Sequence, residues 1–154
     1  MKEILQEKRK LIDILVIILV ALIMGAPLLI SNVDVYCDDG IQHIARAFAT
    51  GQAIKGGSFL GNVIHSFTNG LGYSWNLFYG PVSSIALMLV SIIVRNYIVS
   101  YKIVCFIAMT LSGFFMYKFM LALINNRNAS LLSSVLYMTF PYHLTDLYTR
   151  NALG

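Results

Sequence analysis

Long uncharged apolar runs, separated by shorter polar segments, are the main feature of this chain. The first run covers residues 14–31 without a charge, which is long enough to cross the hydrocarbon of a bilayer as a helix. A second long run covers 103–124, and a third covers 129–140 and continues through Pro141-Tyr-His-Leu. We therefore predict membrane-spanning segments at 11–31, 100–124 and 129–147.

A fourth apolar stretch, residues 81–94, is short for a membrane span. Its length of about 14 residues is typical of an interfacial or re-entrant helix. If it crosses the membrane, the chain crosses four times and Asp146 and Arg150 end in the cytoplasm. If it lies in the interface, the chain crosses three times and Arg127 becomes cytoplasmic. The short length of residues 81–94 and the basic turn around Arg127 favour three crossings. Residues 32–99 then form an outer loop that contains interfacial helices.

The composition agrees with an integral membrane protein. The chain of 154 residues is 58% hydrophobic and 12% charged, and its mean hydropathy is +0.73. Soluble domains carry roughly twice that share of charged residues, and a core of this size cannot bury so much apolar surface. Lipid is therefore expected to be part of the solvent of this chain.

The net charge of +4 reflects membrane topology rather than nucleic-acid binding. The basic residues form no stripe with interleaved aromatic side chains, so nucleic acid is not an expected partner. Basic residues precede the first apolar run, which predicts a cytoplasmic N-terminus; these are Lys2, Lys8, Arg9 and Lys10. A cleaved signal peptide is the alternative, but its apolar region would be shorter and would end in a small-residue cleavage site. Asp13 is expected at the cytoplasmic edge, where its carboxylate reaches water.

Polar side chains recur at helical spacing in the outer loop. Residues 39–50 are predicted to form a helix, with Asp38 or Asp39 as its N-cap and Gly51 as its end. One face would carry Asp39, His43, Arg46 and Thr50, and the opposite face Ile41, Ile44, Ala45 and Phe48. Such a helix is expected to lie on the membrane with its apolar face towards lipid and its polar face towards water.

A carboxylate, an imidazole and a guanidinium at this spacing suit a phosphate-bearing substrate. Asp39 can accept a proton from an attacking hydroxyl group, and Arg46 can hold phosphate oxygens with two hydrogen bonds. The alternative is that the aspartates only cap the helix and that His43 and Arg46 are the solvated side of an amphipathic helix. Aromatic residues around Trp75 are interpreted as an interfacial belt, with sugar stacking as the alternative.

Four short motifs occur in a characteristic order. They are Asp39-x3-His43-x2-Arg46-x4-Gly51, Asn69-Gly-Leu-Gly-Tyr73, Phe78-Tyr-Gly-Pro81 and Tyr148-Thr-Arg150-Asn-Ala-Leu153. This order resembles the bacterial membrane family catalogued as 6-pyruvoyl-tetrahydropterin synthase-related, and more loosely the YfhO-like membrane proteins. Both are similar to the GT-C superfamily of glycosyltransferases, which use polyprenyl-phosphate sugars.

The resemblance implies an all-α integral membrane fold with GT-C-like N-terminal transmembrane helices and juxtamembrane helices in the first outer loop. It implies sugar transfer from a polyprenyl-phosphate donor to a cell-envelope glycopolymer or lipid acceptor at the outer face of a bacterial plasma membrane. By this resemblance, Asp39 occupies the position of the catalytic residue, and Asp38 is the alternative. The residues that match substrate- or phosphate-binding positions are His43, Arg46, Asp146 and Arg150. A divalent cation, magnesium or manganese, is an alternative role for Asp39.

GT-C enzymes have further spans, so residues 1–154 are expected to be the N-terminal part of a longer protein and inactive alone. The rival hypothesis is a non-catalytic membrane protein, either a transporter fragment or a scaffold subunit. Transporters usually place ionisable residues within their spans, whereas the ionisable cluster of this chain lies in a predicted loop. That placement favours an active site at the outer face.

Overall fold

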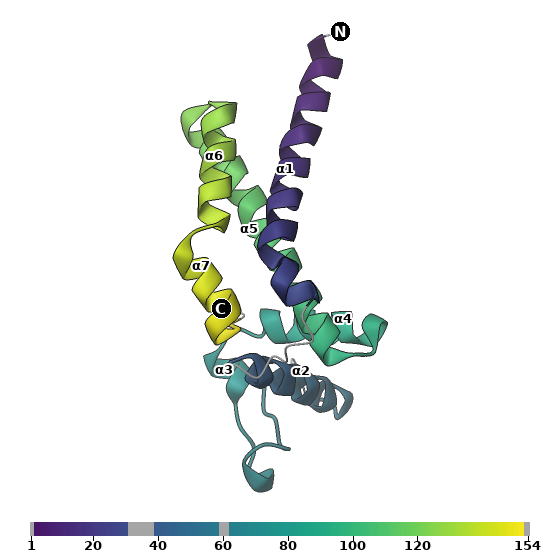
Figure 1. The fold of residues 1–154 in the computed structure, drawn as a ribbon. Helices are drawn as coiled ribbons and strands as arrows, with labels where there is room; N and C mark the ends of the chain where they lie inside the picture. Colours follow the sequence, from purple (N-terminus) through teal and green to yellow (C-terminus); the bar gives the residue numbers. More distant parts are fainter. Residues whose placement is uncertain (1, 31–38, 59–61, 153–154) are drawn as a thin grey trace. The chain divides into compact units, whose positions relative to one another are not determined.

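The structure is a computed structural model that describes residues 2–30, 39–58 and 62–152. Within these ranges the fold is all-helical, as predicted, and contains no strand beyond an isolated bridge between Ile64 and Tyr73. Figure 1 shows the helices. Their bounds are α1 Lys2–Ile30, α2 Gly40–Lys55, α3 Trp75–Phe78, α4 Val82–Val94, α5 Tyr97–Ile124, α6 Arg127–Met138 and α7 Pro141–Thr145. The short turns are η2 Thr68–Gly70 and η3 Asp146–Arg150, the latter a π-helical turn.

The chain folds as two compact units. Unit 1 comprises Met1–Ser31 and Cys105–Thr145, and unit 2 comprises Asn32–Val104 and Asp146–Gly154. Helix α5 therefore begins in unit 2 and ends in unit 1. Each unit joins segments that are far apart in the sequence, so the C-terminal residues Asp146–Gly154 belong with the predicted outer loop.

Two helices are long and apolar enough to cross a membrane: residues Glu7–Ile30 of α1 and all of α5, Tyr97–Ile124. They correspond to the predicted spans 11–31 and 100–124. The third predicted span, 129–147, is not one continuous helix, because α6 ends at Met138 and α7 begins at Pro141. Proline disfavours helical conformation in the residue before it, which explains the break. The number of membrane crossings remains a prediction.

Unit 1 is held together by a small apolar core between α1, α5 and α6. Its buried residues are Ile17, Ala21, Tyr117 and Met138. At Gly113 of α5, a Cβ would overlap the side chain of Met138. The hydroxyl of Ser134 on α6 donates a hydrogen bond of 2.6 Å to the carbonyl oxygen of Gly113. Small residues therefore let α5 and α6 approach closely, as is common in membrane helix pairs.

Unit 2 is built on the packing of α2 against α4. The prediction that Gly51 ends the first loop helix is wrong, since α2 continues to Lys55 and Gly57 adopts a φ of +88° beyond its end. Gly51 instead lies against Met88 of α4, where an added Cβ would come within 3.3 Å of Met88 Cγ. Asp39 is the N-cap residue, but its side chain makes no capping hydrogen bond. The reason is that its carboxylate has another partner, described below.

The close approach at Gly113 generates a stability prediction. Gly113→Leu is expected to reduce the free energy of unfolding by about 1–3 kcal/mol, because the new side chain must displace Met138 from a packed site. Thermal unfolding of the detergent-solubilised protein measures the loss. Gly80→Leu is the control, since a Cβ at Gly80 meets nothing within 4 Å among the described residues. Equal stability of the two variants would contradict the packing role of Gly113.

Candidate functional site

Two residues of the polar face of α2 pack inside unit 2 instead of facing water. Arg46 and Thr50 are buried, whereas Ile41 and Phe48 on the opposite side are about half exposed, at 49% and 51%. The prediction that this face meets water is therefore wrong for Arg46 and Thr50. The physical reason is that the residues beside the polar face, such as Ala47, are small enough for α3 and α4 to pack there, and that the polar groups find partners inside the unit. Contact of the exposed apolar face with lipid stays a prediction.

Arg46 lies against two aromatic rings. Its guanidinium carbon is 4.6 Å from the centroid of the Trp75 ring and 5.4 Å from that of Tyr79. Both distances suit cation–π attraction. The aromatic cluster before α4 therefore supports a buried cation, a role that the interpretation as an interfacial belt missed. The available signal was an arginine at helical spacing before a segment rich in aromatic residues.

The charge of Arg46 has no compensating hydrogen bonds at two of its nitrogens. The side chain is 4% exposed, and neither Nε nor Nη2 has a hydrogen-bond partner among the described residues. The indole Nε1 of Trp75 is likewise buried without an acceptor in the described ranges. Burial lowers the pKa of Arg46. Buried donors without acceptors cost free energy, so an anion that reached them would bind favourably.

A second cluster joins the two ends of unit 2. Nη2 of Arg150 lies 3.0 Å from Oδ2 of Asp39, and Nη1 of Arg150 lies 3.2 Å from Oδ1 of Asp146. The backbone N–H of Asp39 also donates to the carbonyl oxygen of Arg150, at 2.9 Å. The hydrogen bond from Arg150 to Asp39 raises the pKa of the guanidinium. Three residues that the sequence analysis assigned to one site are therefore in contact, and their chemical roles remain predictions.

His43 lies one helical turn after Asp39, and its backbone N–H donates to the Asp39 carbonyl oxygen at 3.0 Å. Burial lowers the pKa of the imidazole, and the positive charge of Arg46 lowers it further, while Asp39 acts in the opposite direction. The ring stacks near Tyr101 of α5, with centroids 6.5 Å apart. A lowered pKa keeps the ring neutral at pH 7, so His43 can accept a proton there.

Two predictions fall outside this cluster. Asp38, the fallback acid, lies outside the described residues. Within the described ranges, no group of three or more His, Cys, Asp or Glu side chains could hold a metal ion. A divalent cation at Asp39 therefore stays a prediction.

The glycine-rich motif 69–73 forms a tight turn. Gly70 and Gly72 adopt φ values of +91° and +83°. The Thr68 hydroxyl donates to the Gly72 carbonyl oxygen at 2.9 Å. These contacts hold the segment as a turn instead of a phosphate-binding loop of the Walker type, which would need a Lys-Ser or Lys-Thr ending.

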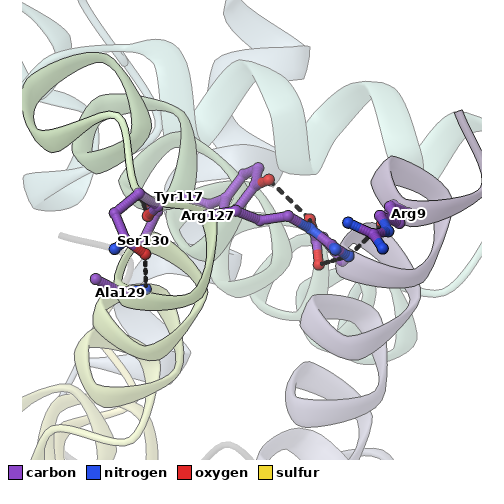
Figure 2. A network of polar contacts seen from close by, with 7 residues as sticks. Arg9, Tyr117, Arg127, Ala129 and Ser130 are labelled. Atoms are coloured by element: carbon purple, nitrogen blue, oxygen red, sulfur yellow. Dashed lines mark hydrogen bonds and ion pairs between the residues drawn. The ribbon is translucent and has the colours of Figure 1, made fainter. Parts of the chain in front are cut away.

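A polar contact in unit 1 was not predicted from the sequence. Asp13 does not reach water: it is 1% exposed and accepts hydrogen bonds from Arg127 and Tyr117. Figure 2 shows Arg127 extending from the start of α6 towards Arg9 on α1, with Tyr117 beside it. The available signal was the carboxylate itself, because an ionisable residue inside an apolar run needs a partner.

Comparisons with known proteins give one distant similarity. The chain is 28% identical over 92 residues to an uncharacterized protein of Lactococcus lactis subsp. cremoris (strain MG1363). The similar region covers 60% of this chain and 15% of that protein, so the chain spans a small part of its relative. No protein family and no solved structure matches the chain.

The lowered pKa of His43 predicts a pH dependence of stability. Its ordinary pKa is 6.5, so on acidification the unfolded chain takes up this proton before the folded chain does. The contribution of His43 to stability is therefore complete above about pH 6.5 and is lost as the pH falls through the lower pKa of the folded protein. Thermal unfolding of wild type and His43→Gln between about pH 8 and pH 5 measures this loss. We expect a smaller loss in His43→Gln, whereas the control Gln42→Ala should follow wild type. Identical pH profiles for wild type and His43→Gln would contradict the assignment.

Proposed function

We propose that this chain belongs to a membrane glycosyltransferase that transfers a sugar from a polyprenyl-phosphate donor to a cell-envelope acceptor. The observation that carries the proposal is the contact between Asp39 and Arg150. Asp39 is the N-cap residue of the helix that carries His43 and the buried cation Arg46. The carboxylate of Asp39 is 38% exposed, so an acceptor can reach it. The resemblance of the motif order to the 6-pyruvoyl-tetrahydropterin synthase-related, YfhO-like and GT-C proteins supports the same reaction.

In the proposed step, an acceptor hydroxyl attacks the anomeric carbon of the donor sugar. The new bond joins the acceptor oxygen to this carbon, and the bond from this carbon to the phosphate oxygen breaks. Asp39 takes the hydroxyl proton as general base, and polyprenyl phosphate leaves with the bonding electron pair. A single displacement of this kind inverts the configuration at the anomeric carbon.

The contacts of Arg46 and Arg150 indicate different roles for these two arginines. Arg150 already faces two carboxylates, those of Asp39 and Asp146, so its charge is largely compensated and its role is to orient the base. Arg46 keeps two buried nitrogens without acceptors in the described part of the chain. We therefore propose that Arg46 stabilises the negative charge that develops on the departing phosphate, because the low polarity around Arg46 strengthens this interaction.

The proposed location is a bacterial plasma membrane, with a cytoplasmic N-terminus and several spans. The lengths of α1 and α5 and the large apolar side chains exposed along them support this location. The second candidate is a non-catalytic transporter or scaffold subunit. The observation that favours it is Asp13, a carboxylate within α1, because intramembrane charge often marks a transport path.

Asp39→Asn tests the catalytic assignment in the full-length protein. The amide can still accept a hydrogen bond from Arg150, so folding should be preserved. Loss of the general base is expected to reduce kcat for sugar transfer by about 10²–10⁴-fold. The control is Glu7→Gln, which removes an exposed carboxylate of unit 1. Undiminished transfer by Asp39→Asn at normal expression would remove this residue from the chemistry.

Arg46→Met separates a phosphate-binding role from a structural one. Methionine keeps the apolar contact with the aromatic rings and removes the buried charge, so the ligand-free variant should be at least as stable as wild type. Its affinity for polyprenyl phosphate should fall roughly 10–100-fold, the value of a charge-assisted hydrogen bond. Thermal shifts with added polyprenyl phosphate measure both effects. Lys55→Met, at the exposed end of the same helix, is the control. A large loss of ligand-free stability with unchanged affinity would show a purely structural role.

A further inference from the structure

Unit 1 contains an ion pair that links the first predicted span to the α5–α6 turn. Arg127 Nε lies 2.6 Å from Asp13 Oδ2, and Arg127 Nη2 lies 2.7 Å from Asp13 Oδ1. The hydroxyl of Tyr117 on α5 donates to Asp13 Oδ2 at 2.8 Å. Nη2 of Arg127 also donates to the carbonyl oxygen of Arg9, at 2.7 Å. The two ionised groups are separated by 114 positions in the chain and meet face to face.

The burial of the two groups differs. The side chain of Asp13 is 1% exposed, whereas that of Arg127 is 35% exposed. Both carboxylate oxygens accept hydrogen bonds, so the charge of Asp13 is compensated within unit 1. A carboxylate that enters lipid alone is costly, and removing one member of a buried pair leaves the other uncompensated. The stable insertion of α1 into a bilayer therefore depends on the ion pair between Asp13 and Arg127.

We propose that Asp13 and Arg127 form an assembly clasp that sets the membrane topology of the chain. The contact requires the N-terminal part of α1 and the α5–α6 turn to lie at the same membrane face. An even number of crossings must then separate Asp13 from Arg127. If α1 and α5 each cross once, α4 does not cross a further time.

The contact between Asp39 and Arg150 in unit 2 gives an independent parity condition. These two residues also share a face, so the chain between them crosses an even number of times. If α4 does not cross and α5 crosses once, the broken segment α6–α7 must cross once. Three crossings follow from the two ion pairs together with the crossings by α1 and α5, which rest on the length and apolar composition of these helices. This inference rests on the membrane location but is independent of sugar transfer.

Cysteine accessibility in intact and permeabilised cells tests the topology. The full-length protein first receives Cys37→Ser and Cys105→Ala, and single cysteines are then placed at Glu7, Gln52, Asn96 and Asn128. We expect the cysteines at positions 7 and 128 to react only after permeabilisation, and those at 52 and 96 to react in intact cells. Opposite faces for positions 7 and 128, or for positions 52 and 96, would overturn the proposal.

A double-mutant comparison tests the clasp itself. Asp13→Asn and Arg127→Gln should each lower the unfolding temperature and the fraction of chains with position 128 on the N-terminal face. The double variant should recover most of both losses, because no lone charge remains buried. Lys10→Gln is the control, since the Lys10–Glu7 pair is exposed. Single variants equal to wild type, or additive losses in the double variant, would refute the clasp. Neither readout uses sugar transfer, so failure of the catalytic proposal would leave this test intact.

Discussion

A buried carboxylate in apolar surroundings needs an opposite charge, and this constraint organises unit 1, where Asp13 is 1% exposed and pairs with Arg127. In unit 2 the more exposed pair of Asp39 and Arg150 joins the two ends of the unit. The paired residues are 114 and 111 positions apart. Each pair therefore joins segments that are distant in the sequence. The apolar residues of these segments do not by themselves select one neighbouring helix, because an apolar helix face packs against lipid or against another helix with similar free energy.

Arg46 differs from the other two arginines. Arg127 and Arg150 face carboxylates, whereas Arg46 faces the rings of Trp75 and Tyr79 and keeps two nitrogens without acceptors in the described ranges. A ring quadrupole attracts a cation but accepts no strong hydrogen bond. Arg46 is thus a buried cation whose hydrogen-bonding capacity is not filled among the described residues, on the same helix as His43.

Helical periodicity predicted this region well but did not predict its orientation. The spacing predicts that the N-cap residue Asp39 and the α2 residues His43, Arg46 and Thr50 lie along one side of the helix. Periodicity does not say which side faces the protein, because a polar face can meet water or a polar partner. Here Thr50 accepts a hydrogen bond of 3.0 Å from Asn76, a contact with a residue 26 positions away that no local pattern encodes.

The helical class, the two long apolar helices and the residues proposed to carry chemistry could all be predicted from the sequence. These follow from hydropathy and residue type, which act locally. Tertiary structure decided which charges meet, where the third apolar run breaks, and that Arg46 and Thr50 of α2 are buried. Those outcomes depend on packing between distant segments, where the cost of an unpaired charge selects one arrangement among several that local preferences allow equally.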